Sequence, residues 1–530
     1  MSVPIAQRRD IISEYVDVVH RVGETLIDQR SVRDRLTVDG VDFWSASSLR
    51  ESSPWGSPIF ARLDVLRDRI VSMSDDSVRA ADGATHKQVD PPSRLRVLGY
   101  WGANVISSLR NRVHRVAGDV VFVVFMPESP AAVSDREIVA RYFGQLPDHV
   151  RSMGLTPVVV FLPTNSRPAS MTKGERRTWR TMRREMISVP ITSFVTPRTV
   201  WRSWRLWRRL QRQAPSSSQV SSALKPNLKV LWPHFEYDFE QSVRGTASAR
   251  SSLLATGLRT MLTVIRGARL VVYPFEGQGW ESLLAQACSQ NNVPSIAYLH
   301  TIMKPWDLRA HTALRECPPR VLALHGEYDR SELQTVAGSA ADTAKMQIVA
   351  VEALRYAYLA QTRVRQSRVS TERRVLIVMG SDCNTSANQF LAITHEISRQ
   401  GKRWEVSVKS HPQCPITGSM SPGVQLVSGS LHESFAGSSA VFLCGTAAPL
   451  DSYLYGLPTA ALADNSGYSM NPLEPDDSYF VGQTPAEVVA WLTSAMERPL
   501  SVPSAERFFD LSPGFTKWEN AIRNAITPQR

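Results

Sequence analysis

Two series of short, wholly apolar runs follow one another along the chain and limit what it can fold into. The first comprises LRVLGY, DVVFVVF, PVVVFLP, LKVLWP, RLVVYPF, SIAYLH, RVLALH and QIVAVE, and the second comprises RVLIVMG, WEVSVKSHP, GVQLVSG, AVFLCGT and PTAALAD. Each run is too short and too uniformly apolar for a half-exposed strand, and helical patterns separate several of them. Such runs are typical of strands buried on both faces of a parallel sheet. The sequence therefore predicts an α/β protein with two doubly wound, Rossmann-like domains.

The length and the polar stretches suggest where the domains begin and end. A chain of 530 residues is too long for one hydrophobic core. Residues 1–90 are predicted to be an N-terminal extension, mostly helical to about residue 73 and ending in a polar linker. We expect the first Rossmann-like domain in 91–365, the second in 366–510, and a C-terminal helix in 511–530 that packs back toward the first. The polar segment QTRVRQSRVSTERR marks the boundary between the two domains.

Composition excludes several classes of protein. The apolar fraction of 43% is that of an ordinary soluble protein, and no apolar stretch reaches the ~20 residues of a membrane span. The first residues lack the apolar block of a signal peptide, so we expect a cytoplasmic protein. The five cysteines are scattered, which favours buried free thiols over a disulfide framework or a zinc site. The sequence contains no internal repeat, P-loop or GxGxxG motif.

The second domain carries the most specific pattern. The run VSVK leads into Ser410, His411 and Pro412, and an imidazole at a strand end can donate a hydrogen bond to a phosphate. Pro412 stops the strand and fixes the direction of the ring. Ligands of doubly wound sheets lie beyond the carboxyl ends of the strands, so this position suits a ligand-binding residue.

A second segment of this domain adds to the predicted nucleotide-sugar site. The strand VFLC is followed by Gly445, where the backbone can approach a ligand, and by a helix N-terminus at which backbone amides would face an anion. Asp451, about one turn into that helix, suits ribose hydroxyls. We assign the following residues to the site: Gly380, Ser381, Lys409, His411, Pro412, Gly445, Thr446, Ala447 and Asp451.

Each of these residues also has an ordinary structural explanation. A lone histidine such as His411 is usually a structural or surface group, and Asp451 fits a solvated helix acid equally well. Thr446 would also serve as a helix cap, although a cap and an anion site use the same amides. Lys409 alternates with the strand pattern and would face solvent in that case.

The stretch YPFEGQGWE in the first domain places a carboxylate, Glu276, at the end of a predicted strand. A strand that ends on Glu276 and continues through two glycines into a helix leaves the carboxylate with little bulk around it. We predict that Glu276 is a general base, and that His300, at the end of SIAYLH, and Glu281 are the competing candidates. Glu281 stands at a helix start, where the helix dipole alone would explain a carboxylate. The acceptor side of the site is assigned to Gly277, Gln278, Gly279, Trp280 and Thr301.

Several of these motifs resemble known families. His411-Pro412 resembles the HP motif of bacterial sialyltransferases, and Gly445, Pro449-Leu450-Asp451, Gly456 and Pro458 are similar to a segment of Kdo transferases. FEGQGWE, PSIAYLHTIMKPWDLR and FFDLSPGFTKWENAI resemble bacterial surface-carbohydrate biosynthesis proteins of glycosyltransferase type. The resemblance covers roughly Leu95 to Ile526 and departs at one point: the sialyltransferase base motif has two acidic residues before its glycine, and here Phe275 takes the place of one.

The resemblance implies a GT-B fold, with two facing Rossmann-like domains, and an inverting glycosyltransferase. The donor would be a CMP-linked acidic sugar of sialic-acid or Kdo type, and the acceptor a surface polysaccharide or glycolipid, as in lipopolysaccharide or capsule synthesis. His411 and Thr446 would hold the leaving phosphate, and such a reaction would need no metal and no cofactor beyond the donor. Two alternatives stay open: a UDP- or GDP-sugar transferase or epimerase, and a non-catalytic scaffold of a polysaccharide assembly complex.

A basic stretch accounts for most of the chain's net charge of +12. Between Met171 and Gln213, two glutamates oppose twelve basic residues, namely Lys173, Arg176, Arg177, Arg180, Arg183, Arg184, Arg198, Arg202, Arg205, Arg208, Arg209 and Arg212. In WRSWRLWRRLQR, arginines fill one arc of a helix, and Trp204, Leu206, Trp207 and Leu210 fill the other. This pattern is typical of an interfacial helix on an anionic membrane, at the inner face of the cytoplasmic membrane. The alternative is an apolar face packed on the protein's own core, and no module supports nucleic-acid binding.

Overall fold

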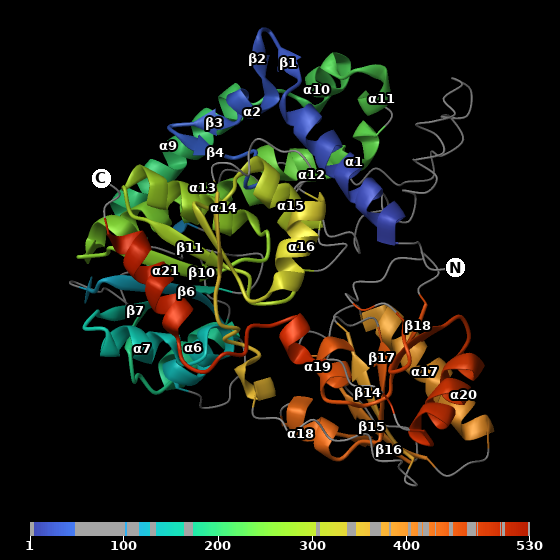
Figure 1. Cartoon of the computed structure of the whole chain (residues 1–530). Helices are drawn as coiled ribbons and strands as arrows, with labels where there is room; N and C mark the ends of the chain where they lie inside the picture. The colour runs from blue at the N-terminus through green and yellow to red at the C-terminus, as the bar shows by residue number, and fades with distance from the viewer. Residues whose placement is uncertain are drawn as a thin grey trace. The chain divides into compact units, whose positions relative to one another are not determined.

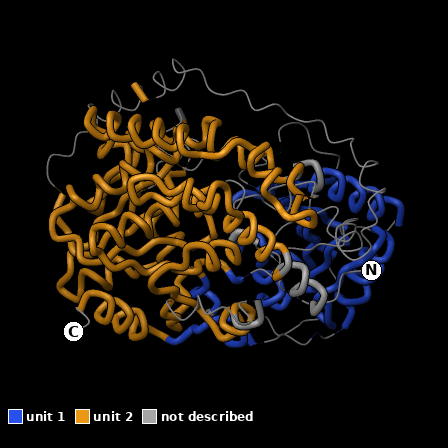
Figure 2. Tube along the Cα trace, turned by 90° about the horizontal axis from the view of Figure 1, so that it is seen from above, with its two compact units in different colours: residues 1–9, 302–307, 356–512 blue, residues 10–301, 308–355, 513–530 orange. Residues whose placement is uncertain are grey.

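The chain folds into two compact units, shown in orange and blue in Figure 2. The computed structural model describes residues 5–47, 101–102, 116–127, 134–163, 173–229, 231–303, 308–336, 346–360, 373–380, 383–400, 404–411, 416, 423–429, 431–444, 449–463, 473, 475–498, 500 and 504–527. The larger unit comprises residues 10–301, 308–355 and 513–530, and the smaller unit comprises 1–9, 302–307 and 356–512.

The larger unit is built on a seven-stranded parallel sheet in the order β13-β12-β11-β10-β6-β7-β8 (Figure 1). Its strands are β6 (Val120–Met126), β7 (Pro157–Pro163), β8 (Ile187–Pro190), β10 (Leu270–Pro274), β11 (Ser295–Tyr298), β12 (Val321–Leu324) and β13 (Gln347–Ala350). Every residue of β7 and of β10 is buried. The runs that form β6, β7, β10, β11 and β12 are therefore strands covered on both faces, as predicted, whereas β13 at the sheet edge is only partly buried. The run LRVLGY lies outside the described residues.

The chain reverses direction across this sheet between β6 and β10. From β6 it moves outward through β7 and β8, then returns to place β10, β11, β12 and β13 on the other side of β6. A short parallel pair, β5 (Val116–Ala117) and β9 (Ile265–Arg266), leads into these two strands. Such a switch point opens a crevice beyond the carboxyl ends of the strands, which is where doubly wound sheets bind ligands.

Helices surround the sheet of the larger unit. They are α6 (Asp135–Phe143), α7 (Leu146–Ser152), α8 (Lys173–Thr181), α9 (Pro197–Gln213), α10 (Ser217–Ala223), α11 (Pro226–Lys229), α12 (Trp232–Val243), α13 (Thr246–Val264), α14 (Gly279–Gln290), α15 (Leu308–Glu316), α16 (Glu327–Val336) and α21 (Thr516–Ile526), with the 3-10 helix η3 (Ile191–Phe194). The core of the unit includes Phe122, Phe143, Phe161, Tyr298 and Trp518.

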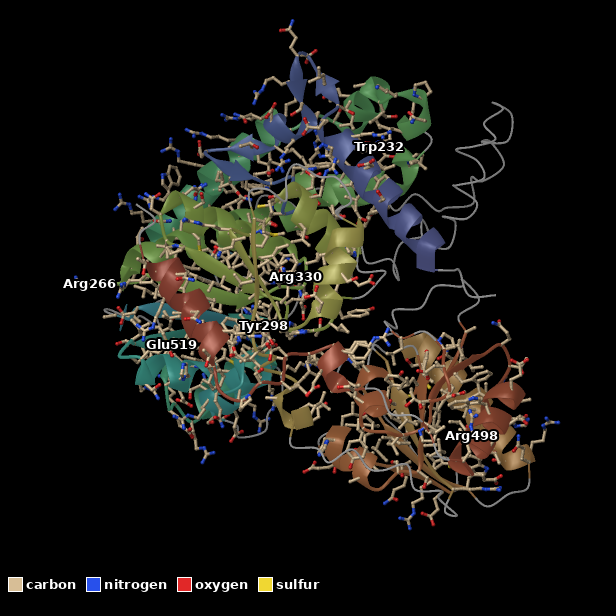
Figure 3. The ribbon with its side chains drawn as sticks, viewed as in Figure 1. Trp232, Arg266, Tyr298, Arg330, Arg498 and Glu519 are labelled. Carbon is tan, nitrogen blue, oxygen red and sulfur yellow. The ribbon has the colours of Figure 1, made fainter. Side chains whose placement is uncertain are left out.

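One predicted strand of the first series is helical. LKVLWP covers the end of α11 and the start of α12, and Leu228, Leu231 and Trp232 (labelled in Figure 3) are buried. Their spacing of three and four residues is that of a helix face rather than a strand. Proline in the first turn of α12 agrees with this, since its missing amide proton is not needed there.

Residues 5–47, the part of the N-terminal extension that the structure describes, are less helical than predicted. Helix α1 (Ile5–Gly23) is followed by two small hairpins, β1 (Leu26–Ile27) with β2 (Arg30–Ser31) and β3 (Thr37–Val38) with β4 (Val41–Asp42), separated by α2 (Val32–Arg35). The turns consist of Asp28-Gln29 and Asp39-Gly40, all four with positive φ. Two-residue turns of this kind match the twist of paired strands, and Asp and Gly tolerate the conformation.

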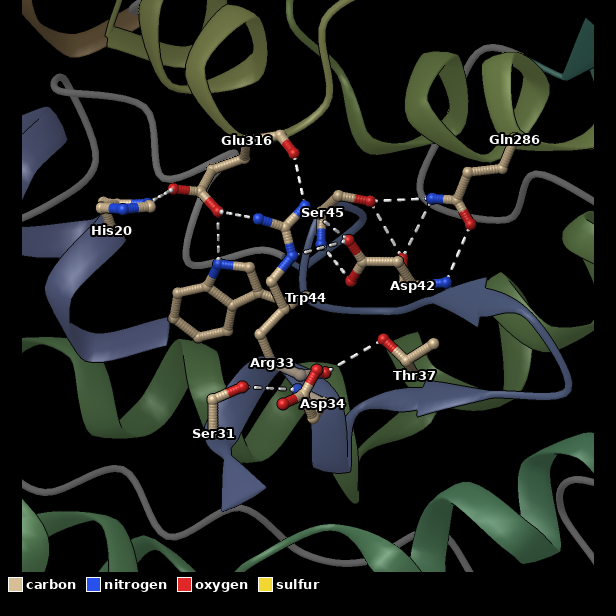
Figure 4. A network of polar contacts seen from close by, with 10 residues as sticks. All are labelled: His20, Ser31, Arg33, Asp34, Thr37, Asp42, Trp44, Ser45, Gln286 and Glu316. Atoms are coloured by element: carbon tan, nitrogen blue, oxygen red, sulfur yellow. Dashed lines mark hydrogen bonds and ion pairs between the residues drawn. The ribbon is translucent and has the colours of Figure 1, made fainter. Parts of the chain in front are cut away.

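A polar network ties this N-terminal segment to the helices of the larger unit (Figure 4). The buried Glu316 at the end of α15 accepts hydrogen bonds from His20 at 2.9 Å, Trp44 Nε1 at 3.0 Å and Arg33 at 3.2 Å. Arg33 also bonds Asp42, whose backbone amide donates to Gln286 of α14 at 2.8 Å. Four charged or potentially charged groups thus satisfy one another where the segment is buried.

The C-terminal helix α21 packs against the sheet of the larger unit. The Glu352 carboxylate, which follows β13, accepts the backbone amides of Lys517 at 2.8 Å and Trp518 at 3.1 Å. An acid at these amides stabilises the positive end of the helix. The Trp518 ring lies 5.2 Å from that of Tyr298 (labelled in Figure 3), and its Nε1 donates to the Glu352 carbonyl.

The apolar face of α9 is buried within the larger unit. Leu206, Trp207 and Leu210 are buried, α9 runs alongside α13 (Figure 1), and Trp207 Nε1 donates to Ser248 Oγ at 3.0 Å. Trp201 is 61% exposed. The expectation that this face inserts into a membrane interface is therefore wrong, because α13 already covers it. The arginines of the opposite face remain at the surface.

The smaller unit contains a six-stranded parallel sheet in the order β16-β15-β14-β17-β18-β19. Its strands are β14 (Arg374–Met379), β15 (Glu405–Lys409), β16 (Val424–Leu426), β17 (Ala440–Cys444), β18 (Thr459–Leu462) and β19 (Tyr479–Gly482), and its helices are η5 (Ala357–Ala360), α17 (Cys383–Arg399), α18 (Leu431–Ala436), α19 (Pro449–Leu454), α20 (Pro485–Met496) and η6 (Ala505–Arg507). The chain reverses direction between β14 and β17. The predicted fold class, two Rossmann-like doubly wound domains, is confirmed by these two sheets.

Candidate functional site

The loop after β10 lies at the switch point of the larger sheet. Strand β10 ends at Pro274, and the amide of Phe275 still bonds the Tyr298 carbonyl at 2.7 Å, so β10 and β11 remain paired up to the loop. Gly277 has a φ of +73°, a conformation that favours glycine, and turns the chain into α14. The helix begins at Gly279.

Glu281 anchors this loop from inside. Its side chain is buried, and its two carboxylate oxygens accept the backbone amide of Glu276 at 3.0 and 3.1 Å and the amide of Gly277 at 2.9 Å. These are charge-assisted bonds, roughly twice as strong as neutral ones. Glu281 therefore acts as a structural acceptor that fixes the loop, which removes it as a competitor for the role of base.

Glu276 and His300 form a pair. Glu276 Oε1 lies 3.2 Å from His300 Nε2, and the two residues follow the adjacent strands β10 and β11. The other carboxylate oxygen of Glu276 accepts the side-chain amide of Gln278 at 2.6 Å. The Glu276 side chain is 29% exposed and that of His300 only 5%. Glu276 is thus the member of the pair that a ligand can reach, and His300 supports it from the protein side.

Aromatic side chains border this pair. Trp280 donates from Nε1 to Gln278 Oε1 at 3.0 Å, and its ring lies 5.3 Å from Phe125 at the end of β6. The Tyr142 ring of α6 lies 5.5 Å from the imidazole of His300. Burial, aided by the negative charge of Glu276, raises the pKa of Tyr142 to about 12, so its hydroxyl keeps its proton at neutral pH. Phe125 stands at the carboxyl end of a predicted strand, whereas nothing in the sequence pointed to Tyr142.

Thr301 follows His300 and is partly exposed. It lies in the loop beyond β11, Gly277 and Gln278 lie in the loop beyond β10, and Gly279 and Trp280 begin α14 directly after that loop. All five residues assigned to the acceptor side are thus close in sequence to the carboxyl ends of two neighbouring strands.

One side-chain hydroxyl links the two strand ends at the switch point of the smaller sheet. The backbone amide of Gly380, just after β14, donates to Ser386 Oγ at 3.0 Å, and Ser386 Oγ donates to the carbonyl of Cys444 at 3.0 Å. Ser386 thereby joins the ends of β14 and β17, on either side of the crevice where α17 begins. Ser381, Pro412, Gly445, Thr446 and Ala447 lie outside the described residues, so their assigned roles stay predictions.

His411 and Lys409 lie at the end of β15, next to β14. His411 is half-buried, and burial lowers the pKa of its imidazole, so that the ring is neutral at pH 7. A neutral imidazole still carries one N–H that can donate to a phosphate. Lys409 Nζ donates to the Gly429 carbonyl at 2.6 Å, and burial lowers the pKa of its amine. This bond directs the Lys409 ammonium to backbone of its own unit.

Asp451 is held by a tyrosine. Helix α19 begins at Pro449, and Asp451 Oδ1 in its first turn accepts the hydroxyl of Tyr358 at 2.6 Å. Tyr358 comes from η5, and its ring meets His432, which in turn meets Tyr455. The Asp451 carboxylate is partly exposed and has a fixed hydrogen-bond partner. Sequence analysis missed Tyr358, which lies more than ninety residues earlier in the chain.

Several kinds of site are missing from the part of the chain that the structure describes. Within it, no three histidine, cysteine or acidic side chains gather in a way that could hold a metal ion. No helix there combines the length and hydropathy that crossing a bilayer requires. Cys288 and Cys444 are buried free thiols, as predicted, and Cys317 is a partly exposed one.

The chain is similar to solved structures in fold, while no protein-family model and no curated sequence matches it. One such structure is the UDP-GlcNAc 2-epimerase of Methanocaldococcus jannaschii in complex with UDP-GlcNAc and UDP, with a TM-score of 0.43, 8% identity, and coverage of 77% of this chain and 99% of that one. Trehalose 6-phosphate synthase from Burkholderia multivorans has a TM-score of 0.38 and 13% identity over 78% and 98% of the two chains. The glycosyltransferase SnogD from Streptomyces nogalater has a TM-score of 0.31 and 10% identity over 72% and 93%. These similarities extend to the fold alone, so the chemistry rests on the side chains described above.

Proposed function

We propose that the protein is a glycosyltransferase of GT-B type that transfers a sugar from a nucleotide donor to a saccharide hydroxyl. The observation that carries this proposal is the Glu276–His300 pair, 3.2 Å apart, at the switch point of a parallel sheet. A carboxylate that is partly exposed and backed by a histidine is suited to take a proton from a hydroxyl group.

Within the pair, Glu276 receives the acceptor proton. It is the more exposed of the two, and Gln278 holds its second oxygen, so its orientation is fixed before an acceptor arrives. A neutral His300 donates its Nε2 proton to Glu276 and so carries the lone pair on Nδ1. This bond directs the carboxylate into the position that the acceptor hydroxyl must meet. His300 is accordingly a positioning residue.

The smaller unit supplies the groups that a nucleotide donor needs. His411 is neutral at physiological pH and able to donate to a phosphate, and Asp451 presents a carboxylate oriented by Tyr358 to a ribose. A phosphate leaves with additional negative charge, which a preorganised donor stabilises. The donor is proposed to be a CMP-linked sialic-acid-like or Kdo-like sugar, on the resemblance of the His411 and Pro449-Leu450-Asp451 motifs. Inversion with a monophosphate leaving group would proceed without a metal.

The acceptor and place of action follow from the same resemblance. A surface polysaccharide or glycolipid of lipopolysaccharide or capsule type is the proposed acceptor. The enzyme would then work in the cytoplasm or peripherally on the inner face of the cytoplasmic membrane, where such saccharides are assembled.

A nucleotide panel tests the proposal. Thermal unfolding is recorded with CMP, UDP and GDP at equal concentrations, because a ligand present at 100 times its Kd stabilises a protein by about 2.7 kcal/mol. Stabilisation by CMP alone supports the proposed donor, and stabilisation by UDP or GDP instead retains the transferase but replaces the donor. The absence of any response to all three nucleotides contradicts the proposed function. Release of the nucleotide from the matching nucleotide sugar then tests turnover.

A further inference from the structure

A basic groove lies between α9 and α13, away from the switch point of the sheet. Its volume is about 370 Å³, and four arginines line it: Arg202, Arg205 and Arg209 of α9 and Arg259 of α13. Positions 202, 205 and 209 are spaced by three and four residues, so their side chains share one face of α9. Asp39, from the turn between β3 and β4, is the single acidic residue in the lining.

Asp39 interacts with two of the arginines that line the groove. Its carboxylate pairs with the Arg209 guanidinium, and its backbone carbonyl accepts Arg259 Nη2 at 3.0 Å. The turn that carries Asp39 lies beside α9 (Figure 1), and Asp39 itself has a positive φ. A carboxylate of the protein itself thus occupies the Arg209 end of the groove.

Two of the four arginines have no such partner among the residues that the structure describes. Arg202 and Arg205 are exposed and make no hydrogen bond or ion pair with any residue that the structure describes. Burial lowers the pKa of the half-buried Arg259, and the negative charge of Asp39 offsets only part of this effect. Four guanidinium groups facing one carboxylate leave a positive excess inside a concave surface, where electrostatic fields are strengthened.

The threonines of the α13 wall do not change this balance. The hydroxyl of Thr260 donates to the Thr256 carbonyl at 2.8 Å, and that of Thr263 donates to the Thr260 carbonyl at 2.8 Å. Their protons are therefore committed to the helix backbone, and the donors available to a ligand are the arginine N–H groups. Guanidinium forks bind phosphate oxygens in a bidentate way.

We propose that this groove is a phosphate-binding site, which takes a phosphate or diphosphate group on Arg202 and Arg205 beside the Asp39–Arg209 pair. The same chemistry is offered by a soluble phosphorylated compound and by the phosphate of a lipid headgroup. Because the apolar face of α9 is buried, a lipid would be held through its headgroup rather than by helix insertion. The site is separate from the proposed catalytic pair and does not depend on it.

Inorganic pyrophosphate is the probe for the first experiment. Its binding to the full chain is measured by titration calorimetry at low ionic strength, where screening is weak. The double variant Arg202→Gln/Arg205→Gln is expected to bind at least ~10-fold more weakly, the equivalent of losing one charge-assisted contact. The matched control is Arg198→Gln/Arg212→Gln, which removes the same charge from exposed positions of α9 outside the groove and is expected to bind within about two-fold of the wild type.

Two further arms sharpen the test. Asp39→Asn keeps a residue that tolerates positive φ but frees Arg209, so pyrophosphate is expected to bind more tightly. Phosphatidylcholine vesicles with and without phosphatidic acid identify the source: binding that depends on phosphatidic acid and is competed by pyrophosphate indicates a headgroup, and pyrophosphate binding alone indicates a soluble ligand. Failure of the wild type to bind pyrophosphate, or an equal loss in both double variants, overturns the proposal.

Discussion

His300 Nε2 lies 3.2 Å from Glu276 Oε1, and the two residues stand on the loops that follow neighbouring parallel strands. The larger sheet brings them together because β10 and β11 are hydrogen-bonded in register up to Pro274 and Tyr298. Glu281 then fixes the loop that carries Glu276 through the amides of Glu276 and Gly277. The Glu281 carboxylate thus has a structural role, and the Glu276 carboxylate remains available to a ligand.

Glu276→Gln is expected to lower sugar transfer by about 10²-fold or more, because the amide keeps the shape of the carboxylate but cannot take a proton at neutral pH. Nucleotide binding, measured by thermal shift, is expected to stay unchanged, since His411 and Asp451 belong to the other unit. Gln278→Ala removes one hydrogen bond to Glu276 but leaves the base in place, so it is expected to lose less activity than Glu276→Gln. If Glu276→Gln keeps most of the activity, Glu276 is not the base.

His300→Asn tests the supporting role of the histidine. We expect a smaller loss than for Glu276→Gln, since a positioning residue acts through the carboxylate. Its distinctive test is a comparison with His300→Ala, which has no side-chain donor for Glu276 and should lose more turnover than His300→Asn. Equal losses of turnover in the two variants would indicate a merely structural role for His300.

Glu281→Gln is expected to reduce stability rather than to act on chemistry alone. The buried carboxylate accepts the amides of Glu276 and Gly277 with both oxygens, whereas a glutamine amide group would turn a donor toward at least one of them. An unsatisfied buried amide costs about 1–3 kcal/mol. Thermal or urea unfolding measures this loss, and an unchanged midpoint would show that the Glu281 bonds are not needed to hold the loop.

The sequence was informative about the sheets because their strands carry a strong and uniform pattern. Runs such as Val120–Met126 and Leu270–Pro274 are apolar throughout, which is typical of a strand covered on both faces. LKVLWP was misassigned because a six-residue apolar run does not distinguish period two from period 3.6. The hairpins between residues 26 and 42 were missed because each strand has only two residues, too few for any periodicity.

The sequence predicted individual residues of the candidate site but not which of them contact one another. Glu276 and His300 were both found because they follow predicted strands, yet they were weighed as competitors. Their pairing depends on β10 and β11 being neighbours, which no local pattern encodes. Tyr142 and Tyr358 were missed for a similar reason. No local sequence pattern shows that Tyr142 lies beside the imidazole of His300 or that Tyr358 bonds the carboxylate of Asp451.

His411→Ala is expected to weaken the binding of the donor nucleotide and to lower turnover by about 10²-fold, the effect of removing one preorganised donor to developing charge. Because burial lowers the pKa of His411 below its usual value of 6.5, the neutral ring predominates above that pH. The contribution of His411 should therefore be constant between about pH 7 and pH 8. Steady-state kinetics of the variant and the wild type across this range check both statements, and wild-type turnover in a folded His411→Ala protein would exclude the role.

The Glu316 network should make stability depend on pH in two directions. Burial alone would raise the pKa of Glu316, but the hydrogen bond from His20 and the charge of Arg33 lower it below 4.5, so its contribution is lost as pH falls through that lowered value. The hydrogen bond to Glu316 raises the pKa of His20 above 6.5, so the contribution of His20 is complete below pH 6.5 and lost as pH rises through the raised value. His20→Gln is therefore expected to lower the unfolding midpoint at pH 5.5 and to have a smaller effect at pH 8.5, while the exposed His395→Gln should do neither. Equal effects of His20→Gln at both pH values would mean that the His20–Glu316 ion pair does not hold the N-terminal segment in place.

Glu316→Gln, which leaves Arg33 with Asp42 as its remaining acidic partner, should lower the free energy of unfolding by about 3 kcal/mol near neutral pH.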